Sequence, residues 1–115
     1  MPNTKHRVFA PQEPSRFDVT MRLWVPTMNL KPAEKFGELV VCLPPNANRL
    51  QSVPLIAALE DRLKDYCEDD YLVAIGDPTL IAAAACICAR RTHGVLRLLK
   101  WDRLMSDYVL VEVRV

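Results

Sequence analysis

The sequence has few of the residues that form phosphate or catalytic sites, and it has no excess charge of either sign. It contains three glycines and two histidines in 115 residues, and neither a G-x-G-x-x-G nor a G-x-x-x-x-G-K-[ST] pattern. A dinucleotide site or a P-loop is therefore not expected. The formal net charge is +1, so no overall field favours a nucleic acid or a membrane surface.

Long apolar runs and a secretory signal are also missing. The longest apolar run, residues 80–89, is about half of the roughly 18 residues that a membrane span requires. The first residues, MPNTKH, lack the apolar core of a signal peptide. We therefore predict a protein of the cytoplasm.

The four cysteines do not form a recognisable metal motif. Cys42, Cys67, Cys86 and Cys88 have spacings that match no zinc pattern. Three of them lie in apolar segments, where a free thiol behaves as a small hydrophobic group, and Cys67 can be exposed. We predict reduced thiols, no metal and no cofactor.

Residues 1–37 are predicted to form an extended, proline-rich arm. Five of the nine prolines lie there, and each removes a hydrogen-bond donor, which argues against a long helix or a central strand. The arm is nevertheless too apolar for a free linker. We expect it to pack on the domain or on a partner, through Phe9, Phe17, Trp24 and Phe36.

Two short elements are predicted within this arm. Alternating apolar residues in 21–25 indicate an edge strand that ends at Pro26. Residues 32–36 read as one helical turn, with a proline at its start and Gly37 after its end.

Residues 38–115 read as a small α/β domain. Continuous apolar runs at 39–43 and 71–75 are typical of parallel strands that are covered on both faces. The predicted order is strand 39–43, helix 52–66, strand 71–75, helix 78–91, strand 95–101 and strand 108–114. The short loop between the last two strands requires an antiparallel hairpin. We predict a minimal Rossmann-like β-α-β-α-β-β domain of two or three layers, with three parallel strands and an antiparallel C-terminal edge strand.

The helix 78–91 has an unusual composition for a surface helix. It carries no charged residue before Arg90. An apolar helix of this kind must be covered nearly all round.

A ligand site, if the domain has one, is predicted at the carboxyl ends of the parallel strands, in the loops 44–49 and 76–79. The candidate ligand-binding residues are Asn46, Asn48, Arg49, Asp77 and Thr79. The alternative for Asp77 is a structural role, because Asp followed by Pro78 is typical of a helix N-cap. We favour the cap.

No catalytic group stands out. His6 lies near the start of the sequence and His93 at a helix end, and no serine lies in a nucleophile elbow. The acidic residues 68–70 are expected to form a solvated turn. We therefore do not expect an enzyme.

A nucleic-acid surface is a further alternative. Cationic side chains beside an aromatic ring are the combination that binds single strands. The candidate residues are Arg90, Arg91, Arg97, Lys100, Trp101 and Arg103. Alternation along a strand places Arg97 and Lys100 on opposite faces, which argues against this surface.

Several segments together resemble small proteins encoded by tailed bacteriophages. They are FAPQEPSRFD at 9–18, WVPT at 24–27, the pair LPP at 43–45 and GDP at 76–78, and LKWDR at 99–103. The resemblance covers most of the chain and assigns no site residues. It implies a compact accessory protein that acts in an infected bacterium, in the virion or on a phage or host partner.

The sequence therefore favours a non-enzymatic accessory or assembly protein that works by association with itself or with another protein. The alternatives are a small-ligand or nucleotide-binding domain and a nucleic-acid-binding accessory protein.

Overall fold

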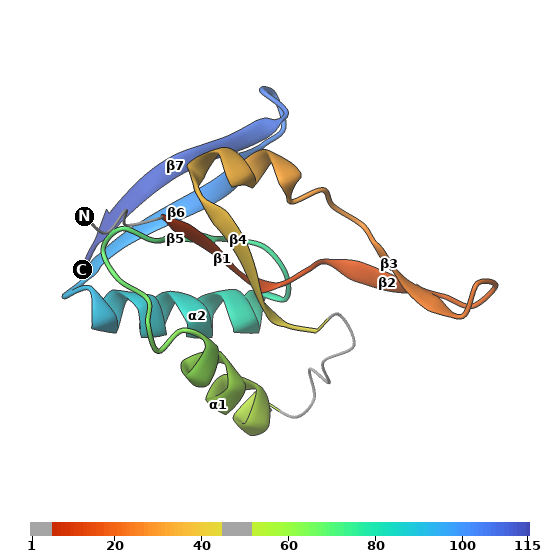
Figure 1. Ribbon diagram of the computed structural model, residues 1–115, viewed down its shortest axis with the longest axis horizontal. Coiled ribbons are helices and arrows are strands. Elements are labelled where there is room, and N and C mark those ends of the chain that lie inside the picture. Colours follow the sequence, from red (N-terminus) through yellow and green to blue (C-terminus); the bar gives the residue numbers. More distant parts are fainter. Residues whose placement is uncertain (1–5, 45–51) are drawn as a thin grey trace.

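The computed structural model describes residues 6–44 and 52–115. At its centre is a five-stranded sheet, in the order β4 (Glu38–Leu43), β1 (Arg7–Gln12), β5 (Tyr71–Val73), β6 (Val95–Asp102) and β7 (Asp107–Arg114) (Figure 1). Strands β4, β1, β5 and β6 are parallel, and β7 pairs antiparallel with β6. The chain is a mixed α/β protein with a mostly parallel sheet and an antiparallel edge pair, as predicted.

Strand β1 corrects the predicted count of three parallel strands to four. We expected no central strand before residue 38, because prolines are frequent there. Pairing with β5 covers only Val8 and Phe9, whereas pairing with β4 continues to Gln12. Pro11 therefore lies beyond the part of the strand that has neighbours on both sides, where a missing N–H is tolerated.

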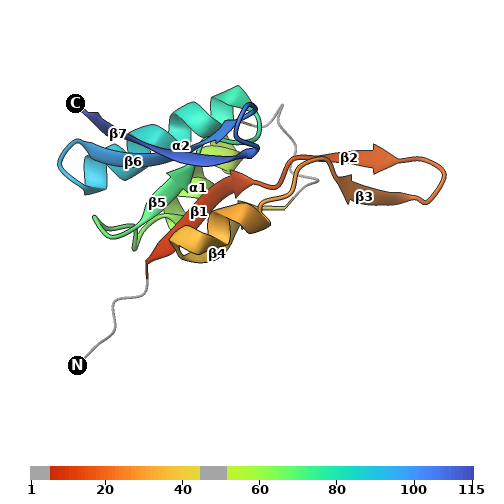
Figure 2. The same ribbon diagram turned by 90° about the horizontal axis from the view of Figure 1, so that it is seen from above.

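Helical elements cover both faces of the sheet (Figure 2). Helices α1 (Ser52–Arg62) and α2 (Pro78–Arg91) lie on one face, and the 3₁₀ helix η1 (Lys31–Phe36) lies on the other. Helix α1 ends four residues before the predicted boundary at Tyr66, although Leu63 and Tyr66 remain buried after its end.

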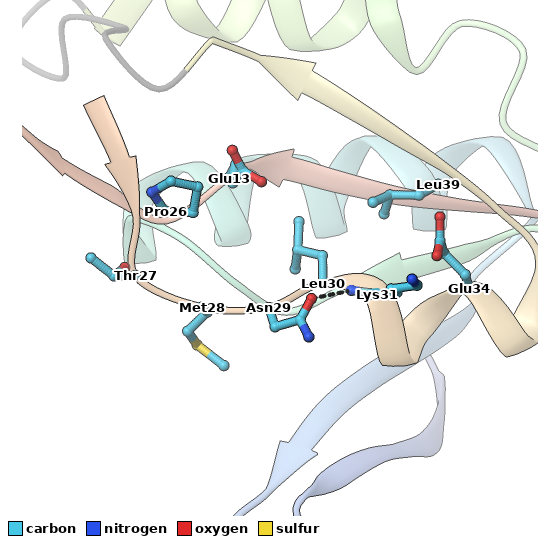
Figure 3. Close-up of a pocket in the computed structure, with 9 residues that line it drawn as sticks. All are labelled: Glu13, Pro26, Thr27, Met28, Asn29, Leu30, Lys31, Glu34 and Leu39. Carbon is cyan, nitrogen blue, oxygen red and sulfur yellow. Dashed lines mark hydrogen bonds between the residues drawn. The ribbon is translucent and has the colours of Figure 1, made fainter. Parts of the chain in front are cut away.

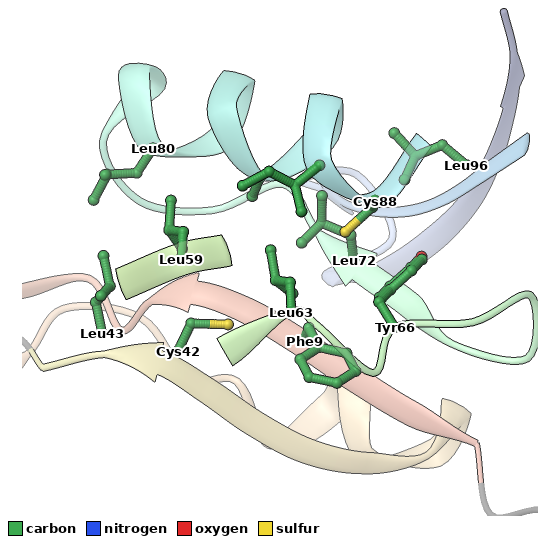
Figure 4. Close-up of a cluster of buried hydrophobic side chains, with 12 residues drawn as sticks. Phe9, Cys42, Leu43, Leu59, Leu63, Tyr66, Leu72, Leu80, Cys88 and Leu96 are labelled. Carbon is green, nitrogen blue, oxygen red and sulfur yellow. The ribbon is translucent and has the colours of Figure 1, made fainter. Parts of the chain in front are cut away.

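The core consists of two apolar clusters, one on each face of the sheet. On the helical side, Phe9 and Cys42 of the sheet meet Leu59 of α1 and Leu80 of α2 (Figure 4). On the other side, Val8 and Ala10 belong to a cluster with Leu30 and Ala33, which lie at and in η1. Successive residues of β1 thus point to opposite apolar layers, which explains its uninterrupted burial.

A buried carboxylate connects the start of β1 to the turn before β5. Asp70, which is 1% exposed, accepts hydrogen bonds from Nη2 and Nε of Arg7 at 2.9 and 3.2 Å. It also accepts the backbone N–H groups of Arg7 and Cys67, at 3.2 and 2.9 Å. The hydrogen bond with Asp70 raises the pKa of Arg7. The acidic turn predicted to be solvated therefore contains one structural, buried residue.

Helix α2 ends in a turn that joins the C-terminal strand. His93 and Gly94 have φ angles of 55° and 87°, in the left-handed region. The N–H of Gly94 donates to the carbonyl of Ala89 at 2.7 Å, and the carbonyl of Gly94 accepts the N–H of Val115 at 2.8 Å. This turn places the C-terminal half of α2 beside the end of β7.

Strands β2 (Ser15–Asp18) and β3 (Leu23–Pro26) form a separate antiparallel hairpin. It extends away from the rest of the molecule (Figures 1 and 2). Of the described residues in the predicted arm 1–37, only residues 14–27 project in this way, and the name arm is kept for these residues alone. The predicted edge strand at 21–25 corresponds to β3, but β3 pairs only with β2 and not with the main sheet.

Candidate functional site

The carboxyl ends of β1 and β5 border a hollow of about 490 Å³. From β1 the chain proceeds to β4 on one side, and from β5 it proceeds to β6 on the other side. Open α/β sheets bind ligands where adjacent connections diverge in this way. Gln12, Glu13, Ile75, Gly76 and Asp77 are among the residues that line the hollow.

Asp77 occupies the predicted N-cap position of α2, but it does not cap the helix with its side chain. The residue has extended backbone angles and Pro78 follows it, yet the carboxylate makes no capping hydrogen bond. Our preference for a side-chain cap is therefore wrong. The half-buried Asp77 instead lines the hollow, and the adjacent Gly76, with φ of 111°, makes the turn.

Of the other predicted ligand residues, only Thr79 lies in the described part of the chain. Thr79 is exposed in the first turn of α2. Asn46, Asn48 and Arg49 lie outside the described residues. The predicted cluster thus stays a prediction.

Two polar residues of the hollow were missed by the sequence analysis. Gln12 is 7% exposed, and its Nε2 donates to the carbonyl of Pro44 at 3.0 Å, next to the end of β4. Glu13 follows it in the chain and lines the hollow. In the sequence, these two residues form a polar pair directly after an apolar run. Such a pair indicates a site at the carboxyl edge of a sheet only when residues 7–12 are recognised as a strand.

The segment between the arm and η1 separates this hollow from two others. One, of about 570 Å³, contains Glu13, Asn29, Lys31 and Glu34, and the Asn29 side chain accepts the Lys31 backbone N–H at 3.0 Å (Figure 3). The other, of about 520 Å³, lies beside Trp101. Met28 lines all three hollows.

The arm carries the clearest concentration of exposed apolar side chains. Phe17 and Trp24 are cross-strand partners whose rings meet edge to face at 5.6 Å, and they are 48% and 40% exposed. Val19, Met21 and Leu23, at or near the tip, are also exposed. Side chains of this kind on a projecting hairpin are typical of a protein-binding surface.

Local hydrogen bonds hold the shape of the arm. The Asp18 carboxylate accepts the backbone N–H groups of Thr20 and Met21, at 2.9 and 3.0 Å. At the base, the N–H of Thr27 donates to the carbonyl of Pro14 at 2.8 Å. The tip and the base are thus each held by a hydrogen bond within the arm. Trp24 also lines the carboxyl-edge hollow, together with Pro78 and Ile81 of α2.

The structure separates the four aromatic residues predicted to bind a partner. Phe9 is 2% exposed in the core, so it cannot contact a partner, which corrects that assignment. Phe36 is half-buried, with its ring 5.5 Å from that of Tyr71. Phe17 and Trp24 remain accessible on the arm.

Three described residues with raised pKa values lie in the core on the helical face of the sheet. Burial raises the pKa of Cys42 to about 12 and raises that of Cys88 and Tyr66, and all three lie in the core. Among the described residues, no group of three or more His, Cys, Asp or Glu side chains is arranged to hold a metal ion.

The candidate nucleic-acid residues do not form one strip. Arg90 and Arg91 precede β6, whereas Lys100, Trp101 and Arg103 lie at its far end, roughly 25 Å away at the usual rise per residue.

Two of the candidate arginines, Arg97 and Arg90, are already held by contacts within the protein. Arg97 lies 4.4 Å from the centre of the Tyr71 ring and donates to the carbonyl of Glu68 at 2.6 Å. Arg90 pairs with Glu60 at 3.5 Å.

Within the described part of the chain, no helix has both the length and the apolar character to cross a membrane. Comparison with curated proteins and with solved structures gave no match. A profile of one family, described as phage Pam3 gp32-like protein, matches residues 6–115. That match spans nearly the whole chain, including the arm, both helices and all five strands of the main sheet. The chain therefore belongs to the phage Pam3 gp32-like protein family.

Proposed function

We propose that this phage protein is a non-enzymatic accessory or assembly protein, which acts in the infected cell or the virion by associating with itself or with another protein through the arm. The observation that carries the proposal is the exposure of Phe17 and Trp24 on a hairpin that stands away from the body.

The exposed apolar area of the arm supports a binding role. The five apolar side chains named above expose roughly 400 Å² together, if a whole aromatic side chain is taken as about 200 Å² and an aliphatic one as about 120 Å². Phe17 and Trp24 share one face of the hairpin, and Leu23 lies on the other. The total area is comparable to the largest apolar patch on a typical monomer, which is often functional.

The architecture of the arm supports the same role. A two-stranded hairpin is marginally stable by itself in water. A partner that covers Phe17 and Trp24 would stabilise it, and the edge-to-face ring pair keeps both side chains in place before binding.

Complementation tests the proposal. A phage that lacks this gene would be supplied with the native protein or with the double variant Phe17→Ser/Trp24→Ser. The variant should keep its circular dichroism spectrum, since the arm lies outside both core clusters, and should fail to restore plaque formation. The matched control is Leu104→Ser/Met105→Ser, which removes two exposed apolar side chains from the β6–β7 turn. Plaques with the arm variant at the native yield would contradict the proposal.

A small-ligand site at the carboxyl edge is the second candidate. The hollow between β1 and β5 favours it, because it lies where the connections diverge. The carboxylates of Glu13 and Asp77 would select a cationic or hydroxyl-bearing molecule over a phosphate. Calorimetric titration with spermidine and with glucose tests this candidate. Heat that is present with the native protein and absent with Asp77→Asn would support it, and no heat with either probe would count against it.

A further inference from the structure

We infer that the arm binds a second copy of this chain and lies there in an apolar groove between α2 and the strands β6 and β7. The inference rests on the proposed function and names the partner of the arm.

The groove is an opening of about 610 Å³ along the C-terminal half of α2. Small side chains of the helix form one wall and apolar side chains of the two strands form the other: Ala85, Cys86, Ala89, Leu96, Leu98 and Val113. The polar side chains on its margin are Arg90 and His93.

The groove exists because the helices cover only part of their face of the sheet. Val111, on the same side of β7 as Val113, is 39% exposed. Cys86 of α2 is also exposed. A helix with no charge before Arg90 should be covered nearly all round, so a single copy leaves this requirement unmet.

The arm and the groove lie at opposite ends of the molecule. In Figure 1 the arm extends to the right, whereas the end of α2 and the C-terminus lie at the left. Because two different surfaces are involved, the contact is heterologous, and repetition of it produces a ring or a filament.

Size and chemistry agree with this occupant. A standard interface buries about 800 Å² per partner, of which somewhat more than half is apolar. The roughly 400 Å² of exposed apolar surface on the arm is close to that share. The volume of the groove falls within the range that accommodates aromatic groups.

Sedimentation velocity under reducing conditions tests the inference with one variant for each surface. Phe17→Ser/Trp24→Ser removes the anchors of the arm, and Cys86→Arg places a bulky charge on the exposed wall of the groove. Ala57→Arg, an equally exposed alanine on α1, is the control. Far-UV circular dichroism would establish that each variant is folded.

The native chain and the Ala57→Arg control should form oligomers that grow with concentration. Each of the other two variants should be monomeric. Loss of the two aromatic anchors of the arm should weaken the affinity between copies by roughly a thousandfold. An equimolar mixture of these two variants should stop at a dimer, because only one intact arm and one intact groove can meet.

Two results would overturn the inference: a native chain that is monomeric at all concentrations, or a mixture that stays monomeric. Failure here is distinct from failure of the proposed function. A monomeric native protein whose arm variant still fails to complement would point to a different protein partner, whereas an arm variant that complements would refute the role of the arm.

Discussion

Replacement of Asp70 by asparagine should destabilise the fold substantially, although the residue lies in a segment that reads as a solvated turn. The substitution keeps the shape of the side chain but removes the charge that accepts two guanidinium hydrogen bonds from Arg7. Hydrogen bonds to a charged group contribute about 1.5–3 kcal/mol each. The Arg7 side chain is 32% exposed, so the released guanidinium can be hydrated in part. We therefore expect a loss of about 2–3 kcal/mol in the free energy of unfolding, below the sum for two such bonds.

The reciprocal variant sharpens this prediction. Arg7→Met leaves the Asp70 carboxylate buried, with only the backbone N–H groups of Arg7 and Cys67 as donors. Removal of one partner of a buried ion pair costs about 3–5 kcal/mol, so this variant should be the less stable of the two. Urea unfolding monitored by circular dichroism measures both. The exposed pair Glu112–Arg114 provides the control, and Glu112→Gln should change stability by less than about 0.5 kcal/mol. A similarly small loss for Asp70→Asn, or the reverse order of the two variants, would refute the reasoning.

Three further outcomes follow from local contacts. Gly37→Ala should cost about 1–3 kcal/mol in urea unfolding, because its Cβ would lie 2.6 Å from the carbonyl carbon of His6 and push β4 from β1; an unchanged midpoint would contradict this. The hydrogen bond from Lys35 holds the pKa of Asp107 below its usual value, so this contribution to stability is present above the usual pKa and is lost as the pH falls. The difference in urea midpoint between the native protein and Lys35→Met should therefore shrink between about pH 5 and pH 3, and a constant difference would argue against it. Asp77→Ala should cost less than about 0.5 kcal/mol, and a loss of about 1 kcal/mol would restore the capping role.

Sequence patterns predicted those elements in which the apolar residues and the flanking turn residues indicate the same structure. The strand and helix on either side of Gly76 carry uninterrupted apolar runs and a distinct turn, and both appear in the fold. Strand β5 is shorter than predicted, since it ends at Val73 and not at Ile75. The C-terminal hairpin followed from its short loop and alternating valines.

Strand β1 was not predicted, because its proline argued against a central strand. The proline is tolerated owing to where the neighbouring strands β4 and β5 pair with β1, which the sequence does not reveal. Pro11 follows the doubly paired residues, which is apparent only from the order of the strands. The error carried over to the site, since Gln12 and Glu13 line the carboxyl-edge hollow only because β1 is central. The sequence likewise indicated that residues 1–37 are apolar, but it did not distinguish Phe9, which is in the core, from Phe17, which is exposed.

Binding through the arm requires that Trp24 be covered when the protein acts. A brief hydroxyl-radical pulse followed by mass spectrometry would compare oxidation of Trp24 in the dilute purified protein and in extracts of infected cells. Trp101, which packs against Tyr108 with ring centres 5.0 Å apart, is the internal reference. We expect oxidation of Trp24 to fall in the infected extract while that of Trp101 is unchanged. Equal oxidation of Trp24 in the two samples would contradict it.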